Sequence, residues 1–229
     1  PGGEAAAVDP GDAEPVIEFI RKTGCRLSSI LITHHHGDHV GGIMKLARRF
    51  PGLPVIGGAG DRGRVPGQTA FLRERDEVRV CGAAARVLEV PGHTRPHVAY
   101  FLSDGAGGGD LFSGDTIFGG TIGNLFEGTP DEMFGSVQKI RALPMRTRIW
   151  CAHEYTRQYL PEALSIEPDN ARLRQRLESL GRSDDPTVPL SLEEECATNP
   201  FFRWDEAALC ARLGTRPGIE TFRRLCEIT

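Results

Sequence analysis

Residues 33–39 read Thr-His-His-His-Gly-Asp-His, and this is the most informative stretch of the sequence. It directly follows a short apolar run that is typical of a buried strand, so the histidines leave the end of a strand. His34 and His36 are two positions apart and project to the same side of an extended chain. The glycine then permits a sharp turn that brings Asp38 and His39 to a neighbouring point. One short loop can therefore supply ligands to two metal ions.

Three further short apolar runs also lead into a potential metal ligand. The ligands that follow these runs are His93, Asp115 and His153. Side chains at strand ends meet at one edge of a sheet, where open sandwiches and α/β proteins place their sites. Imidazole and carboxylate donors without a thiolate suit Zn²⁺, Fe or Mn²⁺ and disfavour a structural zinc site of the cysteine type. The sequence therefore predicts a metal centre with histidine and aspartate ligands.

The histidine run is not typical of a purification tag or of a solvated loop. It lies between a predicted strand and a predicted helix, and it includes Asp38 and His39. His35 and His97 are left over from the ligand pattern. We expect these two histidines to support the ligands or to be structural.

The composition is typical of a globular protein and is compatible with an enzyme. The chain has 229 residues, of which 39% are hydrophobic and 25% charged, enough for one sizeable core or for a main domain with a small appendix. A net charge of -4 gives no general attraction for nucleic acid or anionic membranes, and the apolar stretches are too short to span a bilayer. The six cysteines lack any CxxC spacing, which indicates a reducing compartment. We expect a monomer in the cytoplasm, or alternatively in a mitochondrion or plastid, that acts on a small molecule.

Short strands and helices alternate over the first two thirds of the chain. Thr129 to Glu132 form a capping box, which predicts the start of a helix. The last predicted strand covers residues 146–152. From about residue 156 the pattern is helical, with a second capping box at Ser191 to Glu194 and a segment capped by Asp205. This change of pattern indicates two units.

Four motifs together resemble those of glyoxalase II, the hydroxyacylglutathione hydrolase family of the metallo-β-lactamase superfamily. They are THHHGDH at 33–39, PGHT at 91–94, SGDT at 113–116 and HEYT at 153–156. The HxHxDH pattern alone marks the superfamily, whereas HEYT followed by a helical tail marks a much smaller group of proteins within it. The resemblance continues through EGT at 127–129 and NPFFR at 199–203, so it covers essentially the whole chain.

The resemblance implies an α+β fold, the αββα four-layer sandwich of the metallo-β-lactamases, followed by a C-terminal all-helical domain. The expected domains are a catalytic one at 1–157 and a helical, substrate-binding one at 158–229. Family members usually carry a strand or two before the strand with which this chain begins. We therefore expect the first sheet to be shortened at its N-terminal edge.

The resemblance also implies the roles of the ligands. One metal ion would be held by His34, His36 and His93, and the other by Asp38, His39 and His153, with Asp115 bridging the two. In that family a metal-bridging hydroxide attacks the thioester carbonyl of S-D-lactoylglutathione and releases D-lactate and glutathione, the second step of methylglyoxal detoxification. Asp38 and Asp115 are then the catalytic residues beside the hydroxide. A thiol with a pKa of about 8.5 departs readily as thiolate, so no general acid is needed.

The positions that would bind the thiol carrier depart from the family pattern. The family has a Lys and a Tyr before EGT, two basic residues three apart in the last helix, and the Tyr of HEYT. The corresponding candidates here are Asn124, Phe126, Tyr155, Arg223, Arg224 and Cys226. Of these, Tyr155 keeps the family residue, whereas Asn124 and Phe126 lack a charge and a hydroxyl. Similar losses occur in the branch of the family that uses trypanothione, a less acidic thiol carrier. The sequence therefore leaves the identity of the thiol carrier undecided.

Other members of the superfamily are the alternatives: a trypanothione-type thioesterase, a persulfide dioxygenase with one iron, a lactonase or another hydrolase of this fold. A non-catalytic scaffold is a further possibility of a different class. An idle site would not be expected to keep all seven ligands, which disfavours the scaffold.

Overall fold

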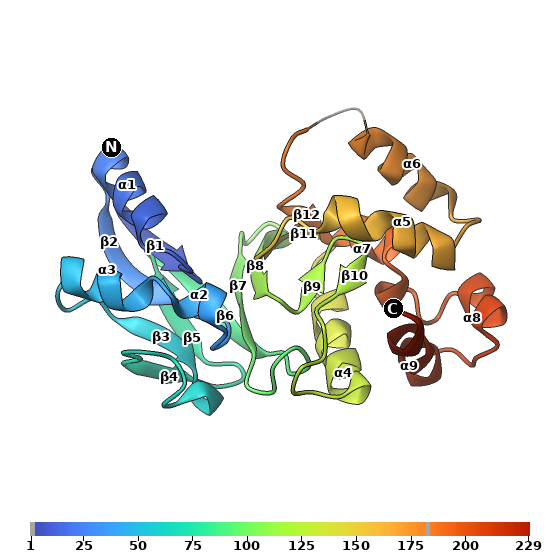
Figure 1. Ribbon diagram of the computed structural model, residues 1–229, viewed down its shortest axis with the longest axis horizontal. Coiled ribbons are helices and arrows are strands. Elements are labelled where there is room, and N and C mark those ends of the chain that lie inside the picture. The colour runs from blue at the N-terminus through green and yellow to red at the C-terminus, as the bar shows by residue number, and fades with distance from the viewer. Residues whose placement is uncertain (1–2, 182–183) are drawn as a thin grey trace. The chain divides into compact units, whose positions relative to one another are not determined.

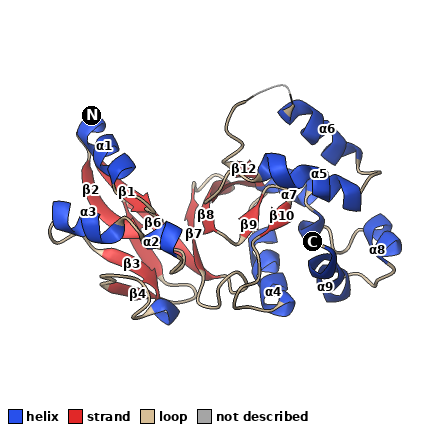
Figure 2. Ribbon diagram, in the orientation of Figure 1, coloured by secondary structure: helices blue, strands red, loops and turns tan. Residues whose placement is uncertain are grey.

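The structure is a computed structural model, and it describes residues 3–181 and 184–229. The chain forms two compact units (Figure 1). Unit 1 comprises Pro1–Glu89 and Arg95–Ser103, and unit 2 comprises Val90–Thr94 and Asp104–Thr229. Strands are prominent in unit 1, and helices dominate the C-terminal part of unit 2 (Figure 2).

Unit 1 contains a parallel sheet and an antiparallel group of strands. Its elements are β1 (Glu4–Val8), α1 (Glu14–Thr23), β2 (Arg26–Leu31), α2 (Gly37–Val40), α3 (Ile43–Arg49), β3 (Val55–Gly58), η1 (Ala59–Asp61), β4 (Ala70–Leu72), β5 (Glu77–Val80), β6 (Ala83–Glu89) and β7 (Val98–Ser103). The parallel sheet has the order β1-β2-β3-β4. β6 pairs antiparallel with both β5 and β7.

The sheet β1-β2-β3-β4 carries the core of unit 1. The apolar face of α1, which includes Val16 and Ile20, packs on a buried cluster that contains Ile30 and Ile32. α1 ends at Gly24, whose φ of 69° is left-handed and costs glycine little. Since β1 and β2 are parallel and in register at their ends, the residues that follow both strands lie at one edge of the sheet.

Unit 2 combines three strands of a sheet, a short hairpin and the C-terminal helices. Its elements are β8 (Gly108–Gly114), β9 (Ile117–Phe118), β10 (Thr121–Ile122), α4 (Pro130–Arg141), β11 (Arg146–Cys151), α5 (Thr156–Ile166), α6 (Ala171–Leu180), β12 (Leu190–Ser191), α7 (Leu192–Thr198), η2 (Pro200–Phe202), α8 (Ala207–Leu213) and α9 (Ile219–Ile228). β8 and β11 are parallel, β12 is antiparallel to β11, and β9 pairs with β10.

Aromatic and aliphatic clusters hold the helices of unit 2 together. The Phe222 ring of α9 lies 5.2 Å from Phe134 on α4 and 5.3 Å from Phe201 on η2, measured between ring centroids. A second cluster joins α5 to α6 through the buried side chains of Leu160 and Leu173. Each of these helices therefore packs on its neighbours through one apolar face.

The predicted elements agree with the structure apart from a few local differences. The capping box at Thr129 is present in full at the start of α4, as predicted. The prediction that the last strand ends at residue 152 is wrong, because β12 follows; a strand of two residues leaves no periodic pattern to detect. The predicted cap at Asp205 is also wrong, since α8 begins after Glu206, while Asp205 pairs with Arg141.

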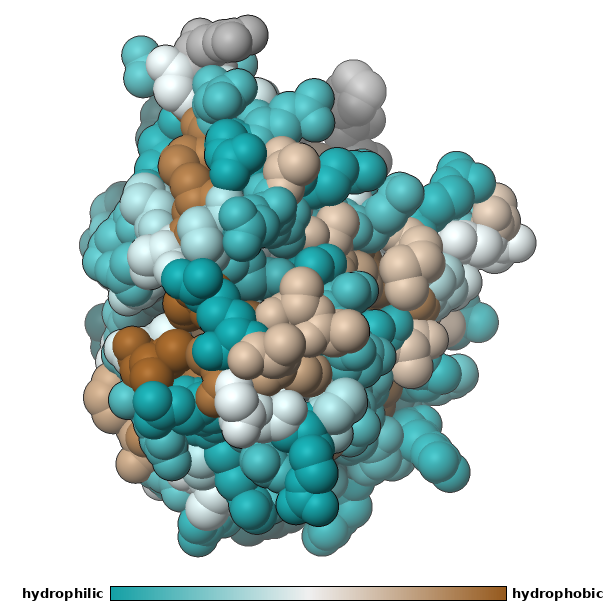
Figure 3. All heavy atoms as spheres, turned by 90° about the vertical axis from the view of Figure 1, so that its right-hand side faces the viewer, coloured by the Kyte–Doolittle hydropathy of each residue, from teal (hydrophilic) through white to brown (hydrophobic). Residues whose placement is uncertain are grey.

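The view in Figure 3 is mainly hydrophilic, with apolar residues in patches between polar ones. Among the described residues, no helix combines the length and the apolar character that crossing a bilayer requires.

Candidate metal centre

The histidine loop of unit 1 begins where β2 ends, as predicted. His34 is fully buried, and its Nε2 lies 3.1 Å from Nδ1 of His36. The rings of His34 and His39 are 4.0 Å apart between centroids. Nε2 of His39 lies 3.5 Å from Oδ2 of Asp38, whose side chain is exposed. The four ligands predicted from this loop therefore come together within unit 1.

Asp9 fixes the base of this loop, and the sequence analysis missed its role. Its Oδ1 accepts a hydrogen bond of 2.7 Å from the Thr33 backbone N–H, and its Oδ2 one of 2.6 Å from the Thr33 hydroxyl. Oδ2 also lies 3.1 Å from Nδ1 of His39 and accepts a hydrogen bond from it. With its proton on Nδ1, the neutral imidazole keeps its free lone pair on Nε2, the atom that would bind a metal ion. Donor atoms of Asp9, His34 and His39 all lie within 4.8 Å of one another. The only sequence signal was an acidic residue directly after an apolar strand.

Two glycines allow the loop to approach Asp9 closely. A Cβ at Gly11 would lie 1.9 Å from the carbonyl oxygen of Asp38, and one at Gly41 would lie 2.5 Å from the carbonyl oxygen of Gly11. Any side chain at these positions would push the loop away from the end of β1. Glycine is thus required by the close approach of two backbones.

The two leftover histidines lie beside the ligands. Nδ1 of His35 is 2.8 Å from Oδ1 of the buried Asp61, and its Nε2 contacts Arg64. The buried ring of His97 stacks on His34, with 4.7 Å between centroids and 18° between planes. Both residues therefore occupy supporting positions, as expected.

The remaining three predicted ligands converge in unit 2. Oδ2 of Asp115, directly after β8, lies 3.5 Å from Nε2 of His93 and 3.5 Å from Nε2 of His153. His93 donates from Nδ1 to the carbonyl oxygen of Asn124 at 2.8 Å, which leaves Nε2 to face the carboxylate. Asp115 thus lies between two imidazoles, and its role as a bridging ligand stays a prediction.

Aromatic rings surround the unit 2 ligands. His153 stacks on Tyr155 with 4.9 Å between centroids and 17° between planes. The rings of Phe118 and Tyr155 lie 5.2 Å apart between centroids in an edge-to-face arrangement. Phe126 contacts His93 at 5.2 Å, and 67% of its surface is exposed. Tyr155 and Phe126 therefore lie beside predicted ligands, and their role in binding substrate stays a prediction.

The other four predicted carrier-binding residues fall into two groups. Asn124 and Cys226 line one pocket of about 180 Å³ in unit 2, whose described lining residues are Thr121, Ile122, Gly123, Asn124, Leu125, Tyr159, Glu162, Cys226 and Thr229. Arg223 instead pairs with Asp131 at 2.6 Å, and Arg224 pairs with Glu227 at 2.9 Å. Burial raises the pKa of the Cys226 thiol to about 11, so this thiol is neutral at physiological pH.

The donor set fits divalent metal ions. Each unit contributes imidazoles and a carboxylate whose donor atoms lie close together, and His34, His39, His93 and Asp115 are buried. Borderline divalent ions take imidazole and carboxylate ligands, and the outer hydrogen bonds from Asp9 and Asn124 are those that orient metal-bound histidines.

Comparison with protein families matches both parts of the chain. The model of the metallo-beta-lactamase superfamily matches residues 1–153, and that of the hydroxyacylglutathione hydrolase C-terminus matches residues 154–228. The predicted domain boundary after residue 157 stays a prediction.

Two curated relatives are named hydroxyacylglutathione hydrolase. The one from Synechococcus sp. (strain ATCC 27144) is 49% identical, over 97% of this chain and 88% of its own length. The one from Nostoc punctiforme is 47% identical, over 98% of this chain and 89% of its own length.

Solved structures show the same fold. The BLEG-1 B3 metallo-beta-lactamase is 28% identical with a TM-score of 0.59, over 66% of this chain and 81% of its own. A protein crystallised in a di-iron-bound form is also 28% identical with a TM-score of 0.59, over 85% of this chain and 87% of its own. The chain therefore belongs to the hydroxyacylglutathione hydrolase, or glyoxalase II, family of the metallo-β-lactamase superfamily, with that superfamily's α+β fold and a helical C-terminal domain.

Proposed function

We propose that this chain is a metal-dependent thioester hydrolase that converts S-D-lactoylglutathione, or a related 2-hydroxyacyl thioester, to D-lactate and free thiol. This reaction is the second step of methylglyoxal detoxification. The observation that carries the proposal is the position of Asp115 between His93 and His153, in a chain 49% identical to a curated hydroxyacylglutathione hydrolase. We further propose that the protein works as a cytoplasmic monomer.

The seven predicted ligands would hold two divalent ions. His34, His36 and His93 would hold one ion, Asp38, His39 and His153 the other, and Asp115 would bridge them. Two such ions, when bound, activate water at neutral pH and polarise a carbonyl oxygen. The ions are Zn²⁺, Fe or Mn²⁺ by ligand type, and a related structure was solved with two irons.

The chain's own residues prepare the site for this chemistry. Asp9 and the Asn124 carbonyl fix the orientation of His39 and His93 through their Nδ1 atoms. Burial of these imidazoles limits the water that can reach them. The thiol leaving group departs as thiolate, which explains why a neighbouring proton donor is not needed.

The pocket beside Asn124 would bind the thiol carrier. The ionisable side chains among its described lining residues are Glu162, Tyr159 and the neutral thiol of Cys226, so it lacks a cation there for a carboxylate of glutathione. Arg223 and Arg224 are held in ion pairs of their own. A carrier with fewer carboxylates than glutathione would suit this pocket better.

The test is to replace Asp115 and measure thioester hydrolysis. Asp115→Ala should lower kcat by at least about a thousandfold, since it removes the proposed bridging group. Asp110→Ala is the matched control: Asp110 lies on β8, the strand that leads into Asp115, pairs with Arg148, and should keep nearly full activity. Oxygen uptake on glutathione persulfide by a protein with one iron would overturn the proposal.

A further inference from the structure

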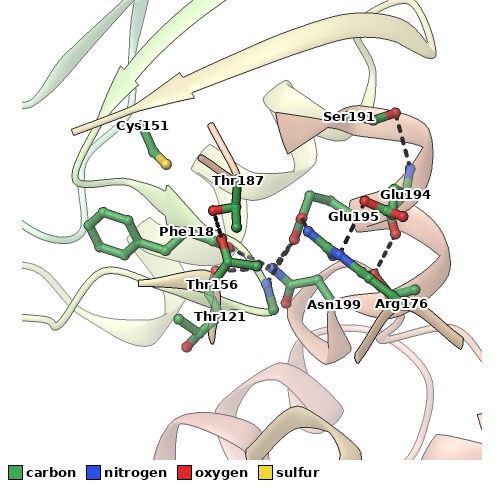
Figure 4. Close-up of polar contacts among 12 residues, drawn as sticks. Phe118, Thr121, Cys151, Thr156, Arg176, Thr187, Ser191, Glu194, Glu195 and Asn199 are labelled. Carbon is green, nitrogen blue, oxygen red and sulfur yellow. Dashed lines mark hydrogen bonds and ion pairs between the residues drawn. The ribbon is translucent and has the colours of Figure 1, made fainter. Parts of the chain in front are cut away.

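Glu195, on α7, is a carboxylate buried completely within unit 2. Its Oε1 accepts a hydrogen bond of 2.6 Å from Nη2 of Arg176, which is also buried. Its Oε2 accepts one of 3.0 Å from the Gly120 backbone N–H and one of 3.0 Å from Nδ2 of Asn199 (Figure 4). One carboxylate therefore joins two helices to the turn of the β9–β10 hairpin.

The β9–β10 hairpin depends on these side chains for its position. It has just two pairs, Phe118 with Thr121 and Ile117 with Ile122, and so short a hairpin is not stable alone. Nδ2 of Asn199 lies within hydrogen-bond distance of two carbonyl oxygens of the hairpin, 3.0 Å from that of Thr121 and 3.3 Å from that of Phe118. The carboxylate and the amide thus bind backbone groups on both sides of the turn.

The hairpin in turn supports the residues that follow β11. Phe118 is buried, and its ring lies 5.2 Å from Tyr155 and 5.9 Å from His153. A Cβ at Gly119 would lie 2.4 Å from the hydroxyl of Thr156, so the turn is packed directly against the first residue of α5. A shift of the hairpin would therefore move the surroundings of His153 and Tyr155.

Stability alone does not explain why this pair is charged. A buried ion pair is commonly no more stabilising than well-packed apolar side chains of similar volume. Directional hydrogen bonds differ from apolar contacts because they define the position of the groups they bind. The Gly120 amide and the Asn199 side chain are the groups that the Glu195 carboxylate positions here.

We propose that Glu195, held by Arg176 and Asn199, is a positioning residue for His153 and Tyr155, acting through the β9–β10 hairpin and Phe118. The effect on catalysis rests on the proposed function, in which His153 is a metal ligand and Tyr155 contacts the substrate. The effect on the hairpin does not depend on that function.

Two double variants separate positioning from stability. Both replace Arg176 by Met; one carries Glu195→Gln, which keeps an oxygen acceptor for Gly120, and the other Glu195→Met, which removes it. The Zn²⁺-loaded proteins are compared by amide exchange at Gly120, the ring resonances of His153, and kcat and KM.

With Glu195→Gln, the amide exchange rate at Gly120 and kcat should stay within about twofold of the parent values. The His153 ring resonances should stay at the parent positions. With Glu195→Met, Gly120 should exchange about tenfold faster, the His153 resonances should shift, and kcat should fall about tenfold. Unchanged exchange and His153 resonances in the Glu195→Met protein would overturn the proposal.

Phe118→Leu provides a test if the Glu195→Met protein does not fold. It should shift the His153 resonances and lower kcat while leaving exchange at Gly120 unchanged, because the hairpin keeps its backbone bonds. Unaltered His153 resonances in this variant would contradict the proposed route. A parent without thioesterase activity would refute the proposed function, while the exchange and resonance data would still decide the hairpin's role.

Discussion

Asp9 illustrates how one side chain that is not a predicted ligand can set the geometry of several that are. Its two oxygens bind the Thr33 backbone, the Thr33 hydroxyl and Nδ1 of His39. The parallel register of β1 and β2 places Asp9 beside the histidine loop. The ligands themselves could be predicted from the sequence because their spacing is local. The role of Asp9 could not be predicted in this way, because it depends on the pairing of two strands.

Asp9→Asn should weaken metal binding without unfolding the protein. The amide keeps the volume but provides one acceptor in place of two, so Thr33 and His39 must compete for it. Loss of such an outer hydrogen bond lowers metal affinity by about 10- to 100-fold. Zn²⁺ affinity is measured by competition with a chelator. Asp12→Asn is the control, since the Asp12 carboxylate binds only the Glu14 backbone N–H among the contacts that the structure gives it; equal losses in the two variants would contradict the assignment.

The helix α4 and the hairpin β9–β10 show what local sequence can and cannot predict at the scale of elements. α4 was predictable because its capping box and apolar spacing lie within the helix itself. The strands β9, β10 and β12 have two residues each and depend on their partners: Glu195 and Asn199 hold the β9–β10 hairpin, and β12 pairs with β11. Their sequences carry no pattern of their own, so tertiary contacts decide them.

Two N-caps of unit 2, Thr129 of α4 and Ser191 of α7, should differ in strength. The Thr129 hydroxyl accepts from the Glu132 N–H at 3.2 Å, and the Glu132 carboxylate accepts from the Thr129 N–H at 2.8 Å. Ser191 has one longer bond, of 3.4 Å, from the Glu194 N–H. Thr129→Ala should lower the free energy of unfolding by about 1 kcal/mol and Ser191→Ala by about half as much. Urea unfolding measures both, and a larger loss for Ser191→Ala would show that the bond lengths do not rank the caps.

At the scale of the whole molecule, family membership is predictable from sequence, whereas the fit to the thiol carrier is not. The motifs quoted from 33–39 to 153–156 led to the family that the comparisons show. The candidates Arg223 and Arg224 were chosen for their charge. Asp131, the partner of Arg223, comes close through folding, where α9 lies against α4, whereas Glu227, the partner of Arg224, is three residues further along α9 itself.

Adding a cation to the carrier pocket should change the preferred thiol. For Asn124→Lys combined with Phe126→Tyr, kcat/KM with S-D-lactoylglutathione should rise about five- to tenfold relative to the trypanothione ester, because a new charge faces the glutathione carboxylates. The parent protein is compared with the same two esters. Ile228→Lys, an exposed change on α9, is the control for added charge alone and should leave the ratio unaltered. Equal ratios in all three proteins would show that residues 124 and 126 do not select the carrier.

The dependence of activity on metal content tests the central claim most directly. The protein is stripped with a chelator and Zn²⁺, Fe or Mn²⁺ is added back in steps, while bound metal and hydrolysis of S-D-lactoylglutathione are both measured. We predict that activity is lost on stripping and returns in full only when two ions are bound per chain. Full activity in the stripped protein, or a maximum at one ion per chain, would contradict the binuclear hydrolase proposed here.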